Sequence, residues 1–161
     1  MNHAAFFRFS ILAACATLTY GAQAADFGSC SYHDKKMQLT DGIAFNKPNE
    51  MHPEKQDLYI ALTSEKLDMA QIDASKNLWH TIIFDEPSAG RLLLGIPTDA
   101  VTYFNAKIPE GGTYVFDYDD PMGVLKLTKK DAHGVAGAYV STAEGKQGVV
   151  CNLTFDVPMA K

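Results

Sequence analysis

The sequence predicts a mainly β protein, an antiparallel β-sandwich of about eight strands with one short inserted helix. Two observations support this fold class. Short runs of β-branched and aromatic residues alternate with turn residues along most of the chain. In the last run, the odd-numbered residues from Val149 to Val157 are apolar and the even-numbered ones mostly polar, so one side of this strand faces a core. A closed β-barrel is the alternative arrangement.

The expected strands follow one another closely along the chain. In order, they cover residues 29–39, 43–45, 58–63, 91–96, 100–108, 113–118, 124–128, 135–142 and 148–157. The run 58–63 is almost entirely apolar, which is typical of a strand covered on both faces. The long polar stretch before it contains Pro48 and Pro53, which disfavour regular structure there.

One segment has helical rather than strand periodicity. Apolar residues recur at helix-like intervals after Asp68, and Asp68 itself is a suitable N-cap. We therefore expect a helix from Asp68 to about Asn77. The following residues, including Trp79, either continue this helix against the sheet or, at 81–84, form another strand.

The first 24 residues have the features of a secretory signal peptide. Arg8 precedes an apolar stretch, and Ala22-Gln23-Ala24 forms a small-x-small cleavage site. Residues 25–161 are then expected to form a single domain that is periplasmic or secreted. Leu12-Ala13-Ala14-Cys15 resembles a lipoprotein box, and the alternative is a lipoprotein anchored through Cys15.

Two cysteines remain after export, Cys30 near the start of the domain and Cys151 near its end. An even number of cysteines in an exported chain indicates a disulfide bond. The alternative is that one of them is a nucleophile, which requires a thiolate beside a histidine. Neither cysteine lies in a recognisable catalytic motif, so we expect the disulfide.

Two parts of the chain are similar to a known group of proteins. Residues 41–45 with 55–67, and residues 134–139 with 152–158, resemble the front half and the end of an uncharacterised family of exported bacterial β-sandwich domains. The family has no assigned activity. The resemblance therefore implies a fold and a compartment, and no reaction.

The charge balance excludes several classes of partner. Once Arg8 is removed, the 14 basic residues fall to 13 against 19 acidic ones, a formal charge of −6. Arg91 is then the only arginine, and no basic cluster exceeds two adjacent lysines. Binding to nucleic acid or to anionic membranes is not expected of such a surface.

No sequence motif indicates an enzyme, a cofactor or a metal. The chain has no HExxH, no G-x-S-x-G and no glycine-rich phosphate loop. The acidic segment 117–123 has some character of a calcium loop, but Pro121 and Met122 stand where an oxygen ligand and glycine are required. An exposed hairpin turn explains this segment better.

We therefore expect a non-catalytic, protein-binding domain, of the kind that acts as an immunity protein or inhibitor against an envelope-acting toxin or hydrolase. The predicted partner-binding residues are Asp117, Tyr118, Asp119 and Asp120, because charge speeds encounter and aromatic anchors hold a complex. The alternative is a module for a small ligand, a sugar, lipid or metal. Tyr118 also belongs to a stripe at 114, 116 and 118 that forms either core or binding surface.

Overall fold

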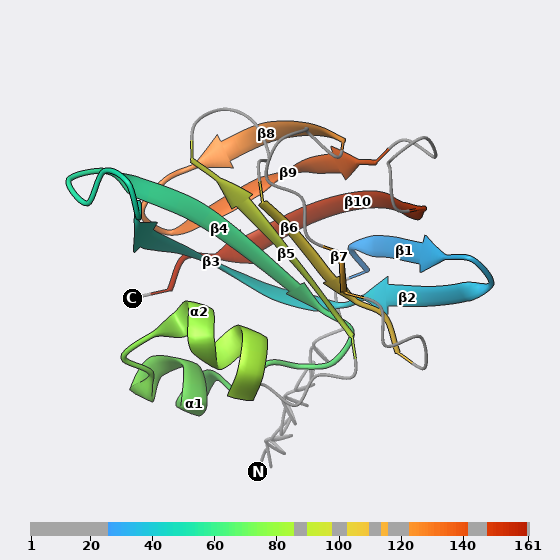
Figure 1. Ribbon diagram of the computed structural model, residues 1–161, viewed down its shortest axis with the longest axis horizontal. Helices are drawn as coiled ribbons and strands as arrows, with labels where there is room; N and C mark the ends of the chain where they lie inside the picture. The colour runs from blue at the N-terminus through green and yellow to red at the C-terminus, as the bar shows by residue number, and fades with distance from the viewer. Residues whose placement is uncertain are drawn as a thin grey trace, which may run out of the picture.

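The computed structural model describes residues 26–85, 90–97, 103–109, 114–115, 123–141 and 148–160. These residues form two antiparallel five-stranded sheets packed face to face, which confirms the predicted β-sandwich (Figure 1). Sheet A contains, in spatial order, β2 (Lys35–Leu39), β1 (Gly28–Tyr32), β10 (Val149–Pro158), β9 (Gly134–Val140) and β8 (Val124–Lys130). Sheet B contains β3 (Asp41–Pro48), β4 (Gln56–Thr63), β5 (Arg91–Ile96), β6 (Tyr103–Lys107) and β7 (Tyr114–Val115).

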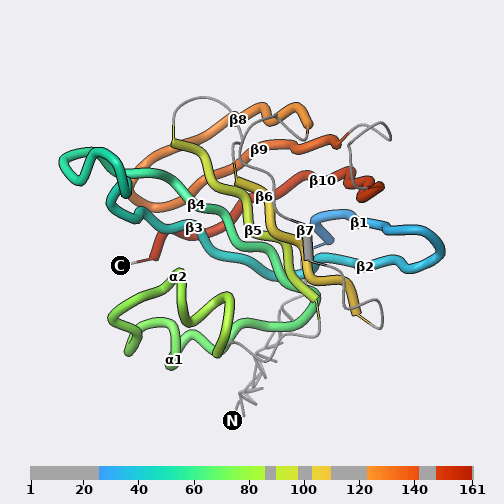
Figure 2. Tube along the Cα trace, in the orientation of Figure 1, coloured from blue at the N-terminus to red at the C-terminus, as the bar shows by residue number. Residues whose placement is uncertain are grey.

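Nearly every pairing joins strands that are neighbours in sequence. Strands β3 to β7 form one antiparallel meander, and β8 to β10 form a second. The exception is β1, which pairs with β10 from Gly28↔Leu153 to Tyr32↔Val149. Figure 2 shows these two strands side by side although they come from opposite ends of the domain. This pairing attaches the β1–β2 hairpin to the C-terminal meander and completes sheet A.

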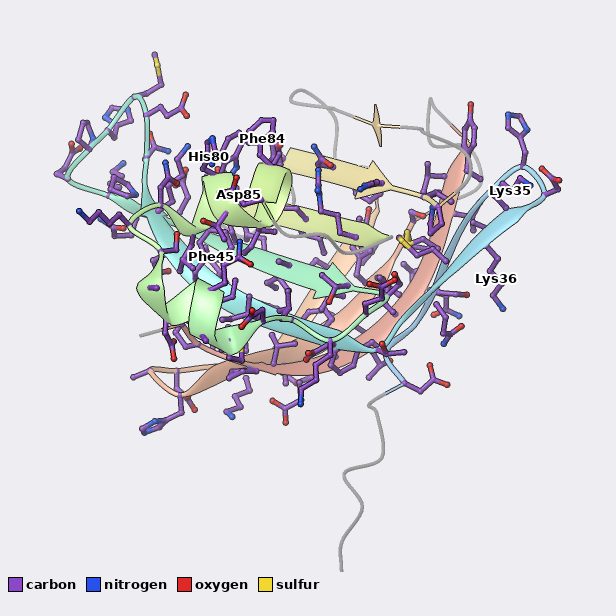
Figure 3. All side chains as sticks on the ribbon, turned by 90° about the horizontal axis from the view of Figure 1, so that it is seen from below. Lys35, Lys36, Phe45, His80, Phe84 and Asp85 are labelled. Carbon is purple, nitrogen blue, oxygen red and sulfur yellow. A yellow bond between two sulfur atoms is a disulfide. The ribbon has the colours of Figure 1, made fainter. Side chains whose placement is uncertain are left out.

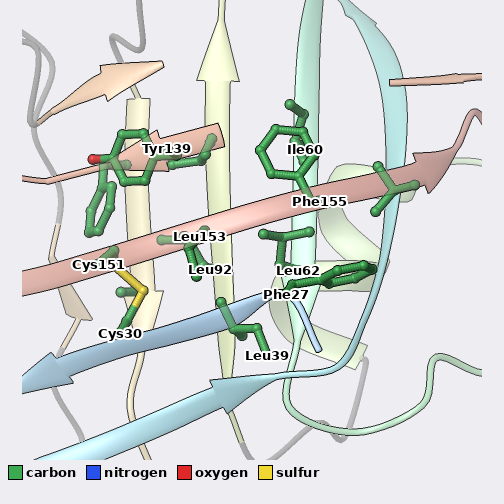
Figure 4. Close-up of a cluster of buried hydrophobic side chains, with 14 of the residues drawn as sticks. Phe27, Cys30, Leu39, Ile60, Leu62, Leu92, Tyr139, Cys151, Leu153 and Phe155 are labelled. Carbon is green, nitrogen blue, oxygen red and sulfur yellow. A yellow bond between two sulfur atoms is a disulfide. The ribbon is translucent and has the colours of Figure 1, made fainter. Parts of the chain in front are cut away.

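The Cys30–Cys151 disulfide lies within this pairing. The two residues face each other directly across β1 and β10, with their Cα atoms 4.1 Å apart. Both side chains are fully buried in the core between the sheets (Figure 4). The bond joins positions separated by 121 residues, so it fixes the two ends of the domain to each other as predicted.

The main core lies between the two sheets. Large side chains of sheet A, among them Leu39 and Phe155, pack there against Ile60 and Leu92 of sheet B (Figure 4). Along β10, buried and exposed residues alternate throughout, which confirms the predicted one-sided strand. The outer face of sheet A is consequently the solvent side of the sandwich.

Sheet B is covered on both faces. A second core on its outer face includes Ile43, Ala61 and Leu93, which point away from the main core. All six residues of β5 and most of β4 are buried as a result. The near-continuous apolar run in β4 is therefore explained by burial of this strand on both faces, as the sequence predicted.

A small helical layer forms the outside of this second core. It consists of α1 (Met69–Ala74), α2 (Leu78–His80) and η1 (Thr81–Asp85), a π-helical turn. Its buried apolar side chains are those of Ile72, Ile82 and Ile83, which pack on sheet B together with Leu67 just before α1. No helix in the described ranges is long and apolar enough to cross a membrane.

The prediction of one helix to Asn77 is wrong. Asp68 does cap α1, accepting hydrogen bonds from the amides of Ala70 and Gln71, but the helix ends before Ser75. Ser75 accepts a hydrogen bond from the amide of Asn77, and Asn77 caps α2. Such short polar side chains offer the backbone local partners and so compete with helix continuation.

Two strand boundaries also differ from prediction. The expected strand 29–39 is a hairpin, because the chain reverses at His33-Asp34 with His33 at φ 52°. Histidine tolerates this left-handed conformation better than most residues, and no glycine marks the turn. The expected short strand 43–45 extends to Asp41–Pro48. The described residues thus contain ten strands rather than about eight.

Arg91 is a buried cation beneath the helical layer. It lies at the start of β5 and is only 3% exposed. Its Nη1 donates a hydrogen bond to the carbonyl oxygen of Ile82, 3.3 Å away. The π-helical turn leaves backbone carbonyls without regular α-helical partners, and the guanidinium holds one of them over the sheet.

We predict that replacing both cysteines with alanine destabilises the domain by about 2–5 kcal/mol while leaving its strand content unchanged. The disulfide lowers the conformational entropy of the unfolded chain, so removing it favours unfolding. The β1–β10 hydrogen bonds do not depend on the disulfide and keep the strands paired. Guanidinium unfolding of the Cys30→Ala/Cys151→Ala protein, followed by circular dichroism, measures this loss. Reduced wild-type protein is the matched control and should behave alike. Equal unfolding free energies for oxidised and reduced protein would contradict the prediction.

Candidate functional site

An open cleft lies where the helical layer ends on the outer face of sheet B. It has a volume of about 220 Å³ and is bounded by the ends of β4 and β5, the β3–β4 loop and α2. We call it the aromatic cleft, because Tyr59, Trp79 and Tyr103 line it. Figure 3 shows the helical layer against the sheet, with Phe45 between the two.

Tyr59, Gly95 and Tyr103 on the floor of the aromatic cleft belong to a row of residues in register across four strands, and Phe45 at the end of this row lines the neighbouring hollow. Phe45 pairs with Tyr59, Tyr59 with Gly95, and Gly95 with Tyr103. The Phe45 and Tyr59 rings stack with centroids 5.5 Å apart, and Tyr103 meets Tyr59 edge to face at 6.0 Å. Tyr59 remains half-buried and so presents part of its surface to the cleft.

Gly95 makes this arrangement of rings possible. A Cβ atom at this position would lie 2.7 Å from the Cβ of Tyr103 and 2.8 Å from Cε1 of Tyr59. Both contacts are far closer than van der Waals packing allows. The glycine therefore provides the space into which the two tyrosines lean.

An ordered loop forms one rim of the cleft. Asp57 is only 8% exposed, and both its carboxylate oxygens accept hydrogen bonds from Nδ2 of Asn49 at 3.0 Å. The Asn49 side-chain oxygen accepts from the amides of Met51 and His52. The Asn49 amide thus ties the β3–β4 loop to β4 and fixes the position of the rim.

Trp79 and Lys47 form the opposite wall. The ammonium of Lys47 lies 5.0 Å from the Trp79 ring centroid, a cation–π contact, and donates a 2.7 Å hydrogen bond to Glu50. This hydrogen bond and the lysine charge lower the pKa of Glu50 below its ordinary value. Glu50 therefore stays ionised at neutral pH, with most of its side chain exposed.

A second hollow lies on the other side of the same two side chains. It has a volume of about 420 Å³ and runs between the end of β3 and the α1–α2 connection. Asn46 and Pro48 of β3 and Lys76 of the connection line it, together with Lys47 and Trp79. The Lys47–Trp79 contact therefore separates two neighbouring hollows.

Local hydrogen bonds hold Trp79 in place. Asn77 caps α2 by accepting from the His80 amide, and the hydroxyls of Ser75 and Thr81 are 2.7 Å apart. The Phe84 ring meets Trp79 edge to face at 6.1 Å. His80 and Asp85, which form a 3.2 Å pair, lie beside Phe84 on the outside of the layer (Figure 3).

The cleft combines aromatic faces with charged and amide groups. Among the described residues that line it, none is a serine, threonine, cysteine or histidine. Within the described residues, no three His, Cys, Asp or Glu side chains gather closely enough to hold a metal ion. The arrangement is suited to contacting a ligand that has both apolar faces and hydrogen-bonding groups.

A separate feature lies on the solvent side of sheet A. Val124 of β8, Val140 of β9 and Val150 of β10 are exposed at neighbouring positions, and Val124 is 69% exposed. Val124 pairs directly with Val140, and Val140 pairs with Asn152, two residues from Val150 on the same face of β10. We call these three residues the valine patch.

The predicted partner-binding residues, Asp117, Tyr118, Asp119 and Asp120, lie outside the described residues. Of the aromatic stripe at 114, 116 and 118, the structure describes Tyr114, whose backbone pairs with Lys107. The described cleft is instead built from residues that the sequence did not assign to a site.

Three weak signals pointed to these residues. Tyr59 interrupts an aliphatic strand, Gly95 interrupts another, and Trp79 is the only tryptophan. The sequence correctly placed Trp79 in a helix on the sheet. What brings them together is strand register, which is a long-range property of the fold.

Comparisons with known proteins identify no relative: no family model, no curated protein and no solved structure matches this chain. The resemblance to exported β-sandwich domains stays a prediction.

We predict that Asn49→Ala destabilises the protein by about 1–3 kcal/mol, because the nearly buried Asp57 carboxylate loses its partner. Urea unfolding measures the change. Asn46→Ala is a matched control, since Asn46 is exposed on the adjacent strand, and it should stay within about 0.5 kcal/mol of wild type. Equal effects of the two substitutions would show that Asn49 does not hold the loop.

Proposed function

We propose that this protein is an exported, non-catalytic binding domain that holds a small polar ligand in the aromatic cleft. The observation that carries the proposal is the row Phe45–Tyr59–Gly95–Tyr103 beside a rim of charged and amide side chains. Aromatic floors with a few fixed polar groups are the usual make-up of ligand sites.

The state of the two cleft carboxylates favours binding over hydrolysis. A glycosidase needs one carboxyl group with a raised pKa to act as a general acid. Lys47 instead lowers the pKa of Glu50, and Asp57 is engaged by Asn49. Glu50 is therefore better suited to accept hydrogen bonds from a ligand than to donate a proton to a leaving group.

The proposal of export draws support from the disulfide. Structural disulfides persist in oxidising compartments and are rare in reducing ones. The Cys30–Cys151 bond is buried at the junction of the two chain ends, where it serves the fold. A periplasmic or secreted location agrees with such a bond and with the predicted signal peptide.

We predict that ligand binding changes the fluorescence of Trp79 and raises the melting temperature. Because Trp79 is the only tryptophan, its emission reports on the cleft wall without interference. A ligand at 100 times its Kd should add about 2.7 kcal/mol to the stability. The probes are a small-molecule extract of the cell envelope and separate panels of sugars, polyamines and fatty acids.

The position of binding is checked by NMR on the same samples. Amide shifts should concentrate in the β3–β4 loop and at the Trp79 indole. Glu50→Gln should weaken binding, whereas Glu54→Gln, an exposed substitution in the same loop outside the cleft, should not. The proposal fails if no probe changes the emission of Trp79, or if the shifts gather elsewhere.

A second candidate function is the binding of a protein partner, as in an immunity protein or inhibitor. The valine patch supports this candidate. Val124 begins β8 shortly after the predicted partner-binding residues Asp117–Asp120 in the sequence, and it is exposed together with Val140 and Val150. An exposed apolar patch is a suitable contact surface for a protein partner, and acidic residues close to it in sequence would favour a basic one.

For this second function we predict that Asp119→Asn/Asp120→Asn slows association with a co-purifying protein and reduces its salt dependence. Val140→Ser should mainly speed dissociation, because it removes apolar contact. Surface plasmon resonance at two ionic strengths measures both. Asp73→Asn, at an exposed position of α1 on the opposite side of the sandwich, is the control. Unchanged rates in all variants would rule out this surface.

A further inference from the structure

The aromatic cleft and the second hollow are adjacent and share the side chains of Lys47 and Trp79. From this arrangement, and resting on the proposed function, we infer that the ligand is an oligosaccharide. Neighbouring sugar rings occupy the two hollows, one on each side of Trp79.

The size of the hollows indicates a chain rather than one compact molecule. Pockets that enclose a drug-sized ligand have volumes of roughly 300–1,000 Å³. The aromatic cleft alone, at about 220 Å³, is smaller than this, whereas the two hollows of about 220 and 420 Å³ together give about 640 Å³. A ligand that fills both must pass the Lys47–Trp79 contact, which a linear chain of rings can do.

The chemistry of the lining matches that of a sugar. A pyranose ring with equatorial substituents presents C–H groups on its faces and hydroxyls around its edge. The half-buried rings of Tyr59 and Trp79 offer flat apolar surfaces for the ring faces. Glu50, with most of its side chain exposed, and Lys47 beside it, can accept from and donate to edge hydroxyls.

Other ligand classes fit less well. A fatty acid needs an enclosed apolar cavity, but the space between the sheets is filled by the main core, and the cleft rim is charged. An organic cation would be repelled by the Lys47 ammonium, which lies 5.0 Å from the centroid of the Trp79 ring. A neutral chain with many hydroxyls meets neither obstacle.

The test uses β1→4 oligomers of glucose and of N-acetylglucosamine, from one to four rings, titrated against the full-length mature protein. Calorimetry and the emission of Trp79 report binding. The affinity should rise at least roughly tenfold, about 1.4 kcal/mol, from one ring to the longer chains. Lys76→Ala, which changes only the second hollow, should remove this gain and leave single-ring binding intact. Lys66→Ala, on an exposed residue that lines neither hollow, is the matched control.

Each outcome decides between the two proposals. A length-dependent gain that Lys76→Ala abolishes supports the inference. Equal affinity for one ring and for four, or a gain unaffected by Lys76→Ala, overturns it. If no sugar binds but a polyamine changes the emission of Trp79, the inference fails and the proposed function stands. Binding of a fatty acid alone would overturn both, because the proposed ligand is polar. If no class of probe does so, both fail.

Discussion

The architecture depends on the pairing of the first strand with the last. Sheet B is a single meander of strands that follow one another in sequence, but sheet A consists of a hairpin and a meander from opposite ends. Only the β1–β10 ladder, with Cys30 bonded to Cys151, makes these two pieces one sheet. Bringing together two strands so far apart in sequence costs chain entropy. The disulfide reduces this cost, because it already restricts the conformations of the unfolded chain. Without sheet A the main core would lose one of its two walls.

The cleft exists because the helical layer covers only part of the outer face of sheet B. Its strands β4 and β5 are apolar on both sides, so its outer face requires a cover, and the short helical layer supplies one. That layer is smaller than the face. Where it ends, at Trp79, the row of aromatic residues on the sheet is only half covered. The candidate site is thus the uncovered end of the second core, and the β3–β4 loop forms part of its polar rim.

Local sequence patterns were sufficient for much of the fold. The alternation in β10, the apolar run in β4 and the cap at Asp68 each depend on neighbours in sequence, and each was confirmed. The β1–β2 turn was missed because His33 adopts its positive φ without a glycine to mark it. The site was missed for a different reason. Tyr59 and Tyr103 meet at Gly95 only because three strands align in one register, and no single segment shows that alignment.

The two outer faces of the sandwich offer different kinds of surface. The face of sheet B is recessed, aromatic and rimmed with fixed polar groups, whereas the valine patch on sheet A is open and apolar. A recess that can surround a ring favours a small ligand, while an open patch favours another protein. Because the main core lies between these faces, a ligand in the cleft leaves the valine patch free. Binding a glycan on one side and a protein on the other is therefore compatible within this single sandwich, and the two proposals can be tested independently.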